Sequence, residues 1–407
     1  MWIRGDILDK KEIIDNLTKV KLVVGNGYDL HCGLKSSYKD FFMRDEAKNK
    51  YFITWINSFK DKAVTFVDFT KYNHRDFWVE FSHLDKTNIW DFFFYIKTKL
   101  NNSNDQKEWL WCDIETVMFD SLRENTDRGF NNSTFNWGLV YMAINEGLSA
   151  NVNNWEVLVL AGVILKMRNF QKFKNKDEFY EFLLNELHVF EAEFGDFIAK
   201  KRHYFDGFIV HNNLPFDRNS QITLSILCKK ENLVSIDSFN FDNIGDESLD
   251  SIFHNINGDV NNPIFGVDST LCNASDPRFI FTKTNRRMEL EMVSFDSKKD
   301  IEFENAIVYG HSLSGSDYSY FFPLLDKLEI SNFTSNKKIV FSYSIYDLDK
   351  EYQIRKTNRL NIQRLFEAYA KYKSMSEPTR LLDSLTTQNR VITYEIPNLQ
   401  LPKNSFF

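Results

Sequence analysis

The chain alternates between short apolar runs and segments in which apolar residues recur every three or four positions. Four runs rich in β-branched and aliphatic residues are typical of buried strands (20–24, 233–239, 306–309 and 339–345), and 390–395 is a fifth candidate. The first three end in small or polar residues, as strands do when they enter a turn. Strands that alternate with helices predict an α/β fold with a Rossmann-like parallel sheet.

A long helical segment interrupts this pattern. Between about residues 45 and 220, aromatic and aliphatic side chains recur at helical spacing, for example at Phe179, Phe182, Leu183, Leu187, Phe190 and Phe194. Strand patterns flank this segment on both sides, so it is an insertion after the first strand–helix unit. We therefore predict a Rossmann-like nucleotide-binding core of residues 1–45 and 221–407, and a helical insertion of residues 46–220.

Composition limits the class of protein. Of the 407 residues 43% are hydrophobic, with 39 Phe, 17 Tyr and 8 Trp, which excludes intrinsic disorder as the main state. The chain has 50 basic and 57 acidic residues and a formal net charge of −7. This balance argues against a protein that binds nucleic acid along its whole length, although a local basic groove remains compatible with it.

The sequence also bears on location. Its four cysteines (Cys32, Cys112, Cys228 and Cys272) lack zinc-type spacing, and no disulfide framework is expected. The first residues lack the pattern of a secretory signal. The longest apolar stretch, 157–165, has nine residues, whereas a membrane-spanning helix needs about 20. We expect a cytoplasmic protein with no membrane partner.

Three predicted strands are followed by residues that suit a ligand site. Gly25-Asn26-Gly27 follows the first, Asn240-Phe241-Asp242 a central one, and Gly310-His311-Ser312 another. In parallel sheets, ligands bind beyond the carboxyl ends of the strands, and glycines let backbone N–H groups approach phosphate. The GxGxxG motif is incomplete, because Leu30 stands in place of its third glycine. A tight turn without a ligand is the alternative interpretation.

Six segments occur in an order that resembles the AbiH family of bacterial abortive-infection proteins. They are GNGYDL (25–30), LKSSYKDFF (34–42), WCDIE (111–115), SFNFD (238–242), NINGDVNNPIFGVD (255–268) and YGHSLSGSD (309–317). The resemblance covers about three-quarters of the chain. It implies a protein that protects bacteria from phage by arresting or killing the infected cell, with a phage-encoded trigger as partner.

The same order is more distantly similar to sirtuin-like NAD-consuming domains. This similarity implies NAD or a related nucleotide as the ligand, and no catalytic metal. In this similarity Gly25 and Gly27 match the pyrophosphate-binding turn, Asn240 and Asp242 match the pair that contacts the nicotinamide ribose, and Gly310 with Ser312 match the last ribose or phosphate contact. Asp317 matches the acidic residue that ends the GHSL segment of AbiH-like proteins, and with Asn26 and Asp29 it is a further candidate for binding the nucleotide.

One position departs from both families. Where they have His-Gly, this chain has Asn257-Gly258, and an amide cannot take a proton near neutral pH. His254 lies three residues earlier, and His311 follows another strand, so both are candidate bases. Loss of the base leaves nucleotide binding with slow or no hydrolysis.

Glu115 falls within an apolar helical stripe formed by Trp111, Ile114, Met118 and Leu122, whereas Asp113 projects to the opposite face. A carboxylate in an apolar stripe requires a partner or a ligand. A buried ion pair with Arg or Lys and a role in the site are the two interpretations.

A group of basic residues (Arg278, Lys283, Arg286 and Arg287) precedes the strand at 306–309. Such a group binds phosphates of a nucleotide or nucleic acid in some proteins. A solvated loop is the alternative, and it is the commoner case on an acidic protein.

Three functions are compatible with these residues. The leading hypothesis is an anti-phage protein that hydrolyses NAD, in which Asn240 positions the ribose. A non-catalytic nucleotide sensor or assembly component, including a homo-oligomer, is favoured by Asn257. A metal-dependent nuclease acting on nucleic acid would need carboxylates such as Asp29, Asp242, Asp268 and Asp317.

Overall fold

The computed structural model describes ten stretches of the chain, and all structural statements concern these residues. They are 10–34, 36–42, 88–100, 111–123, 135–146, 154–212, 216–242, 247–289, 302–375 and 377–398.

The chain divides into two compact units. The sheet unit comprises Met1–Ser37, Gly195–Pro263 and Glu289–Phe407, and the helical unit comprises Tyr38–Phe194 and Ile264–Met288. These boundaries differ from the predicted segments, because residues 195–220 group with the sheet and 264–288 group with the helices. Periodicity along the chain identifies helices, but it does not show which of them pack together.

The sheet unit is built on six parallel strands. They are β1 (Val20–Val24), β2 (Leu233–Ser238), β3 (Phe253–Asn255), β4 (Asn305–Tyr309), β5 (Lys338–Ser344) and β6 (Val391–Ile396), in the spatial order β3-β2-β1-β4-β5-β6. The predicted parallel α/β sheet is therefore confirmed. Strand β3 was missed because it has only three residues, all half-buried, which is too short for an apolar pattern.

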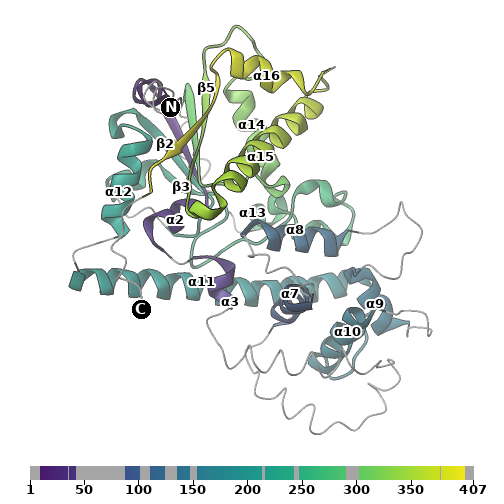
Figure 1. Cartoon of the computed structure of the whole chain (residues 1–407). Helices are drawn as coiled ribbons and strands as arrows, with labels where there is room; N and C mark the ends of the chain where they lie inside the picture. The colour runs from purple at the N-terminus through teal and green to yellow at the C-terminus, as the bar shows by residue number, and fades with distance from the viewer. Residues whose placement is uncertain are drawn as a thin grey trace. The chain divides into compact units, whose positions relative to one another are not determined.

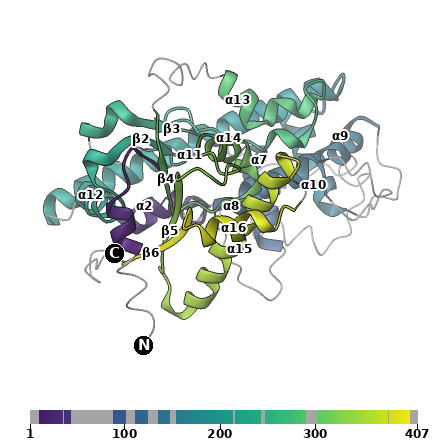
Figure 2. The ribbon, with the colours of Figure 1, turned by 90° about the horizontal axis from the view of Figure 1, so that it is seen from above.

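Helices cover both faces of this sheet (Figures 1 and 2). Helices α2 (Asn26–Cys32) and α12 (Phe216–Leu227) pack on one face, and α14 (Tyr318–Lys327), α15 (Glu351–Tyr372) and α16 (Arg380–Thr387) pack on the other. Successive side chains of a strand point to opposite faces, so Leu22 and Val24 join the first core and Val23 joins the second. Coverage of both faces explains why the central strands are apolar throughout.

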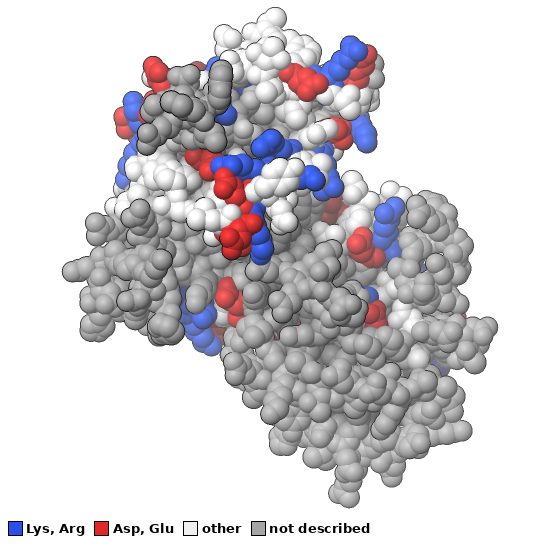
Figure 3. Space-filling model, viewed as in Figure 1, with Lys and Arg blue, Asp and Glu red and all other residues white. Residues whose placement is uncertain are grey.

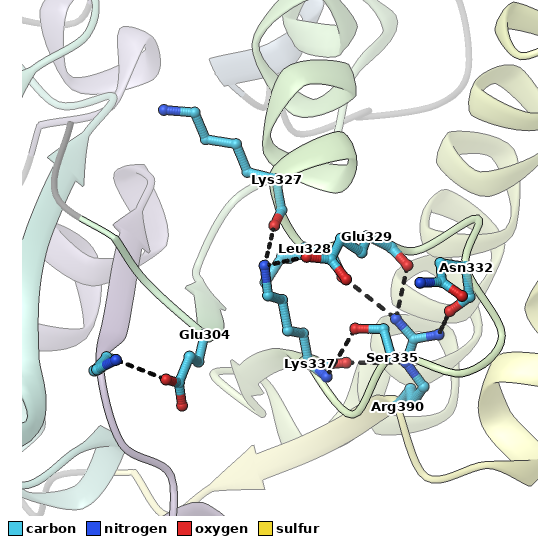
Figure 4. Close-up of polar contacts among 9 residues, drawn as sticks. Glu304, Lys327, Leu328, Glu329, Asn332, Ser335, Lys337 and Arg390 are labelled. Carbon is cyan, nitrogen blue, oxygen red and sulfur yellow. Dashed lines mark hydrogen bonds and ion pairs between the residues drawn. The ribbon is translucent and has the colours of Figure 1, made fainter.

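One buried guanidinium lies at the edge of the sheet where the strands begin. Arg390, just before β6, donates to the carbonyl oxygens of Leu328, Glu329, Asn332 and Lys337 at 2.7–3.3 Å (Figure 4). Two of these carbonyls belong to the residues that follow α14, where helical hydrogen bonding ends. Arg390 therefore ties the end of α14 and the start of β5 to β6.

The helical unit contains only helices, turns and one isolated bridge among its described residues. Its helices are α3 (Tyr38–Phe42), α7 (Ile89–Leu100), α8 (Trp111–Leu122), α9 (Trp137–Asn145), α10 (Trp155–Met167) and α13 (Lys283–Glu289), together with the first part of α11 (Lys176–Asn212). The predicted stripe on α11 is buried except for the half-buried Phe182. No described helix is both long and apolar enough to cross a bilayer.

Candidate functional site

The candidate site lies between β1 and β4, where the helices that follow neighbouring parallel strands change from one face of the sheet to the other. Strands β1 and β4 are neighbours, yet β1 leads into α2 on one face and β4 leads into α14 on the other. In doubly wound sheets such a switch point opens a crevice at the carboxyl ends of the strands, where ligands bind. The order 3-2-1-4-5-6 is that of dinucleotide-binding sheets.

Three glycines bring the two strand ends together. The Gly25 N–H donates to the Tyr309 carbonyl at 3.0 Å, and the Gly27 N–H donates to the Gly310 carbonyl at 2.9 Å. A Cβ atom on Gly27 would lie 2.7 Å from the Gly310 Cα. Gly310 has a φ of +65°, and a Cβ atom there would lie 2.6 Å from the Tyr28 nitrogen. The glycines are therefore required for close backbone approach, and the role of this turn in holding phosphate remains a prediction.

No loop separates β1 from the next helix. Gly25 is the N-cap of α2, so the predicted strand-to-turn segment is already helical from Asn26 onward. This arrangement places Asn26 and Asp29 on the first turn of α2, directly after the carboxyl end of β1. Helix α2 was missed because its seven residues carry too short an apolar pattern.

Four polar side chains form what we call the Asp29 cluster: Asn26, Asp29, Ser36 and Asn240. The Asn240 Nδ2 donates to the Asp29 Oδ1 at 2.7 Å and to the Gly25 carbonyl at 3.2 Å. The Ser36 hydroxyl donates to the Asn26 Oδ1 at 2.6 Å and lies 3.4 Å from the Asp29 Oδ2. Asp29, Ser36 and Asn240 are buried. The fold thus joins residues from three segments of the sequence.

Ser36 was not among the predicted site residues. The sequence pattern placed it at the start of the helix that begins at Tyr38, which explains only its backbone position. Its occurrence in the LKSSYKDFF segment, one of the six shared with AbiH proteins, was the signal that pointed to the site.

Asp242 and Asn257 lie close to this cluster. Both are buried, and the Asn257 Nδ2 is 3.5 Å from the carbonyl of Phe239, the residue before Asn240. Asp242 follows β2, whose last residue Ser238 pairs with Val24 at the end of β1. Its charge and that of Asp29 add to the raised pKa of the Cys32 thiol on α2, which is mainly caused by burial. The structure therefore gathers Asn26, Asp29, Asn240, Asp242 and Asn257 beside the end of β1.

His311 is held within the loop after β4. Its Nδ1 accepts the Leu313 N–H at 2.9 Å, and its Nε2 lies 3.5 Å from the Asp317 Oδ2. The ring packs between Phe239 and Phe321, with centroids 4.3 and 5.0 Å away. Both nitrogens thus have partners within the chain. The neighbouring Ser312 accepts a hydrogen bond through its carbonyl, from Asn361.

His254 belongs to a different polar group. Its Nδ1 lies 3.5 Å from Asp237, which also binds Lys21 at 2.6 Å and the Tyr320 hydroxyl at 2.5 Å. Burial raises the pKa of Asp237, but the contacts with His254, Lys21 and Tyr320 outweigh it and lower this pKa to about 2. His254 therefore helps to hold a buried carboxylate on the α14 face of the sheet, and no described contact joins it to the Asp29 cluster.

Glu115 lies in the helical unit and is paired. The Lys283 Nζ is 2.8 Å from the Glu115 Oε1 and 2.9 Å from its Oε2, and both side chains are buried. Ile114, Met118 and Leu122 are buried, as the apolar stripe predicted. The side chains of Trp111 and Asp113 lie outside the described residues. The charge of Glu115 thus has the cationic partner that its position requires.

A second buried ion pair lies in the same unit. Arg286 donates from its two terminal nitrogens to the two oxygens of Glu191, at 2.8 and 2.9 Å. Glu191 also accepts the Phe265 N–H at 2.7 Å. Arg278 binds Asp276 and the Leu122 carbonyl. Both interpretations of the basic group, a solvated loop and a phosphate-binding patch, are therefore wrong for Arg278, Lys283 and Arg286.

The carboxylates of the nuclease hypothesis do not assemble into a metal site. Asp268 accepts the Thr270 N–H at 2.9 Å and so caps its own turn. Within the described residues, no group of three or more His, Cys, Asp or Glu side chains is arranged to hold a metal ion.

An all-parallel sheet with helices on both faces and buried polar residues at its switch point defines a doubly wound α/β protein of the Rossmann type. The model of the family described as bacteriophage abortive infection AbiH matches residues 22–343. The chain belongs to this family of abortive-infection proteins. Comparisons with curated proteins and with solved structures find no match. The similarity to sirtuin-like domains therefore remains a prediction.

Proposed function

We propose that this AbiH protein binds a nucleotide of the NAD type at the carboxyl edge of its sheet, beside the β1–β4 switch point. The observation that carries the proposal is the Asp29 cluster, which gathers polar side chains from three segments at the place where doubly wound sheets bind nucleotides. Burying polar side chains is costly, so they are rarely gathered in the interior without a function. We therefore interpret the buried cluster at the strand end as part of a ligand site.

The side chains of the cluster suit a ribose. A carboxylate such as Asp29 accepts hydrogen bonds from vicinal hydroxyls, while the Asn240 amide both donates and accepts. The Gly25 and Gly27 N–H groups are already bonded to the end of β4. We therefore assign recognition to the side chains of Asn26, Asp29, Ser36 and Asn240, and we assign to the glycines the close backbone packing that positions them.

Binding without rapid turnover is the chemistry that these residues support best. Asn257 replaces the family histidine, the His311 Nδ1 accepts a hydrogen bond while its Nε2 lies 3.5 Å from Asp317, and His254 contacts Asp237. We therefore propose a nucleotide sensor within the abortive-infection response. NAD hydrolysis is the second candidate, since Asp29 is a carboxylate beside the proposed ribose position that can stabilise a developing oxocarbenium ion.

Two measurements on the purified protein test the proposal. Thermal unfolding with and without NAD measures binding, and chromatography of the incubated mixture measures released nicotinamide, with an EDTA-treated sample to detect metal dependence. We expect a rise in Tm with NAD and no nicotinamide. Nicotinamide released by a route that resists EDTA supports the hydrolase instead. If NAD neither raises the Tm nor yields nicotinamide, NAD is rejected as the ligand.

The chain offers a matched control for the site. Asn240→Ala removes the amide that binds Asp29, and Asn305→Ala removes a buried amide at the opposite edge of the sheet, where it donates to the Thr18 carbonyl at 2.8 Å. Each loses about 1–3 kcal/mol of stability, because a buried partner is left unsatisfied. Only Asn240→Ala loses the stabilisation by NAD. Equal loss in both variants contradicts the assignment of the site.

A further inference from the structure

The segment after β5 carries the most exposed large apolar side chains in the described part of the chain. Tyr346 and Leu348, which precede α15, are 67% and 78% exposed, and Tyr352 and Leu360 on α15 are 77% and 41% exposed. Single exposed apolar residues are common on protein surfaces, whereas several within a short segment mark a binding surface.

Cations accompany these aromatic residues. Residues 352–366 contain four basic residues and no acidic one. Lys356, Arg359 and Arg364 are exposed. On α15, Tyr352, Lys356, Arg359 and Gln363 fall within an arc of about 60° at 3.6 residues per turn, and Arg364 lies about 80° beyond this arc. Blue side chains gather over the helix labelled α15 in Figure 1 (Figure 3).

Acidic residues lie on both sides of this face: Asp347 and Glu351 before it contact cations, and Glu367 after it accepts a hydrogen bond from Gln363 at 2.9 Å. Asp347 is 3.4 Å from Lys350 and caps the following turn, and Glu351 contacts Arg355. Arg355 also makes two contacts with Glu395 of β6, at 2.8 and 3.1 Å. Asp349 lies in the same short turn, and Glu367 lies at the far end of the basic stretch. The three exposed cations form no ion pair with a described carboxylate.

The surface is exposed but its backbone is anchored. Asn361 donates to the Ser312 carbonyl at 2.9 Å, and the underside of α15 buries Ile354, Ile362 and Leu365 in the core. An exposed tyrosine on an anchored backbone suits stacking, because only side-chain entropy is lost when a ring packs against it.

We propose that this face, composed of Tyr346, Tyr352, Lys356, Arg359 and Arg364, binds single-stranded nucleic acid. Bases stack on the tyrosines, and the cations contact phosphates along the ~18 Å from Tyr352 to Arg364. An acidic protein would satisfy the cations but would leave the exposed tyrosines without flat partners. The site is separate from the proposed nucleotide pocket and uses none of its residues.

Fluorescence anisotropy with labelled 20-nucleotide single strands of mixed sequence, as DNA and as RNA, tests this proposal on the full chain. We expect binding to at least one of them, with a slope of log K against log salt of about −2 for three phosphate contacts. Tyr352→Ala weakens binding roughly 5-fold to 150-fold, since it removes one stacking partner. The triple variant K356E/R359E/R364E abolishes binding.

A matched triple variant distinguishes the effect of this surface from the effect of net charge. K200E/K229E/K327E changes the charge equally at exposed lysines on other elements and should retain binding. The proposal is overturned if neither strand binds, if both triple variants lose affinity equally, or if a duplex of equal length or polyglutamate binds as well as the single strands. A dimer in sedimentation velocity that the α15 triple variant dissociates also overturns it, because the face is then a self-interface. Stabilisation by NAD should be unchanged in all of these variants.

Discussion

Two groups of buried carboxylates, one in each unit, contact different kinds of side chain. In the helical unit, Glu115 and Glu191 bind Lys283 and Arg286, so charge meets opposite charge. At the carboxyl edge of the sheet, Asp29 binds the amide of Asn240 and the hydroxyl of Ser36, groups that bring no charge. The first arrangement pairs buried opposite charges within the helical unit. The second joins polar side chains at the edge of the sheet where doubly wound proteins bind ligands.

The sequence segments shared with AbiH proteins also divide between the helical unit and the Asp29 cluster. WCDIE supplies Glu115 and NPIFGVD supplies Phe265, whose N–H binds Glu191, and both serve the helical unit. GNGYDL and SFNFD supply Asp29 and Asn240 of the cluster. A segment shared by a family is therefore not by itself evidence of a catalytic site, because some shared segments build ion pairs inside a helical core.

Breaking one buried ion pair should have the largest effect. Glu191→Ala leaves Arg286 buried without its carboxylate and removes the acceptor of the Phe265 N–H. We expect a loss of about 3–5 kcal/mol in the free energy of unfolding by urea. The double variant E191L/R286M, which removes both charges, should recover most of this loss. If the single change costs less than about 1 kcal/mol, the pair does not hold the helical unit together.

A methyl group at the switch point should have the next largest effect. Gly310→Ala places a Cβ atom 2.6 Å from the Tyr28 nitrogen at a φ of +65°, so both sterics and backbone conformation oppose it. We expect a loss of about 2–4 kcal/mol in urea unfolding. Gly315→Ala, five residues further on, is the control, because nothing lies within 4 Å of the added carbon. Similar losses in the two variants would mean that the close contact of β1 and β4 is not required.

Asp237 tests whether a carboxylate of the sheet unit can also be stabilised by cations, because it contacts Lys21 and His254 as the carboxylates of the helical unit contact theirs. Its folded pKa, about 2, lies below the ordinary value of 3.8, so its stabilisation is present above that value and is lost as pH falls. The shift corresponds to about 2 kcal/mol, lost between about pH 5 and pH 2. Urea unfolding at pH 6 and pH 3 measures the loss, and Asp237→Asn should reduce it. An unchanged pH dependence in that variant assigns the loss to other carboxylates.

Much of the fold followed from local patterns. The apolar runs identified β1, β2, β4, β5 and β6, because a strand buried on both faces must be apolar over several consecutive residues. The aromatic stripe of α11 was also predicted, since its period is a property of the chain itself. Strand β3 and helix α2 escaped detection because neither is long enough to express a period.

For the site, the sequence determined which residues follow the strands, and therefore which side chains reach the carboxyl edge. It also determined that Glu115, a carboxylate in an apolar stripe, needs a partner. Only the tertiary structure decided who the partners are. Lys283 is 168 positions from Glu115, and Asn240 is 211 positions from Asp29. The same applies to His254, whose Nδ1 lies 3.5 Å from Asp237. The physical reason is that burial and periodicity act along the chain, whereas hydrogen bonds and ion pairs depend on distances that exist only once the chain has folded.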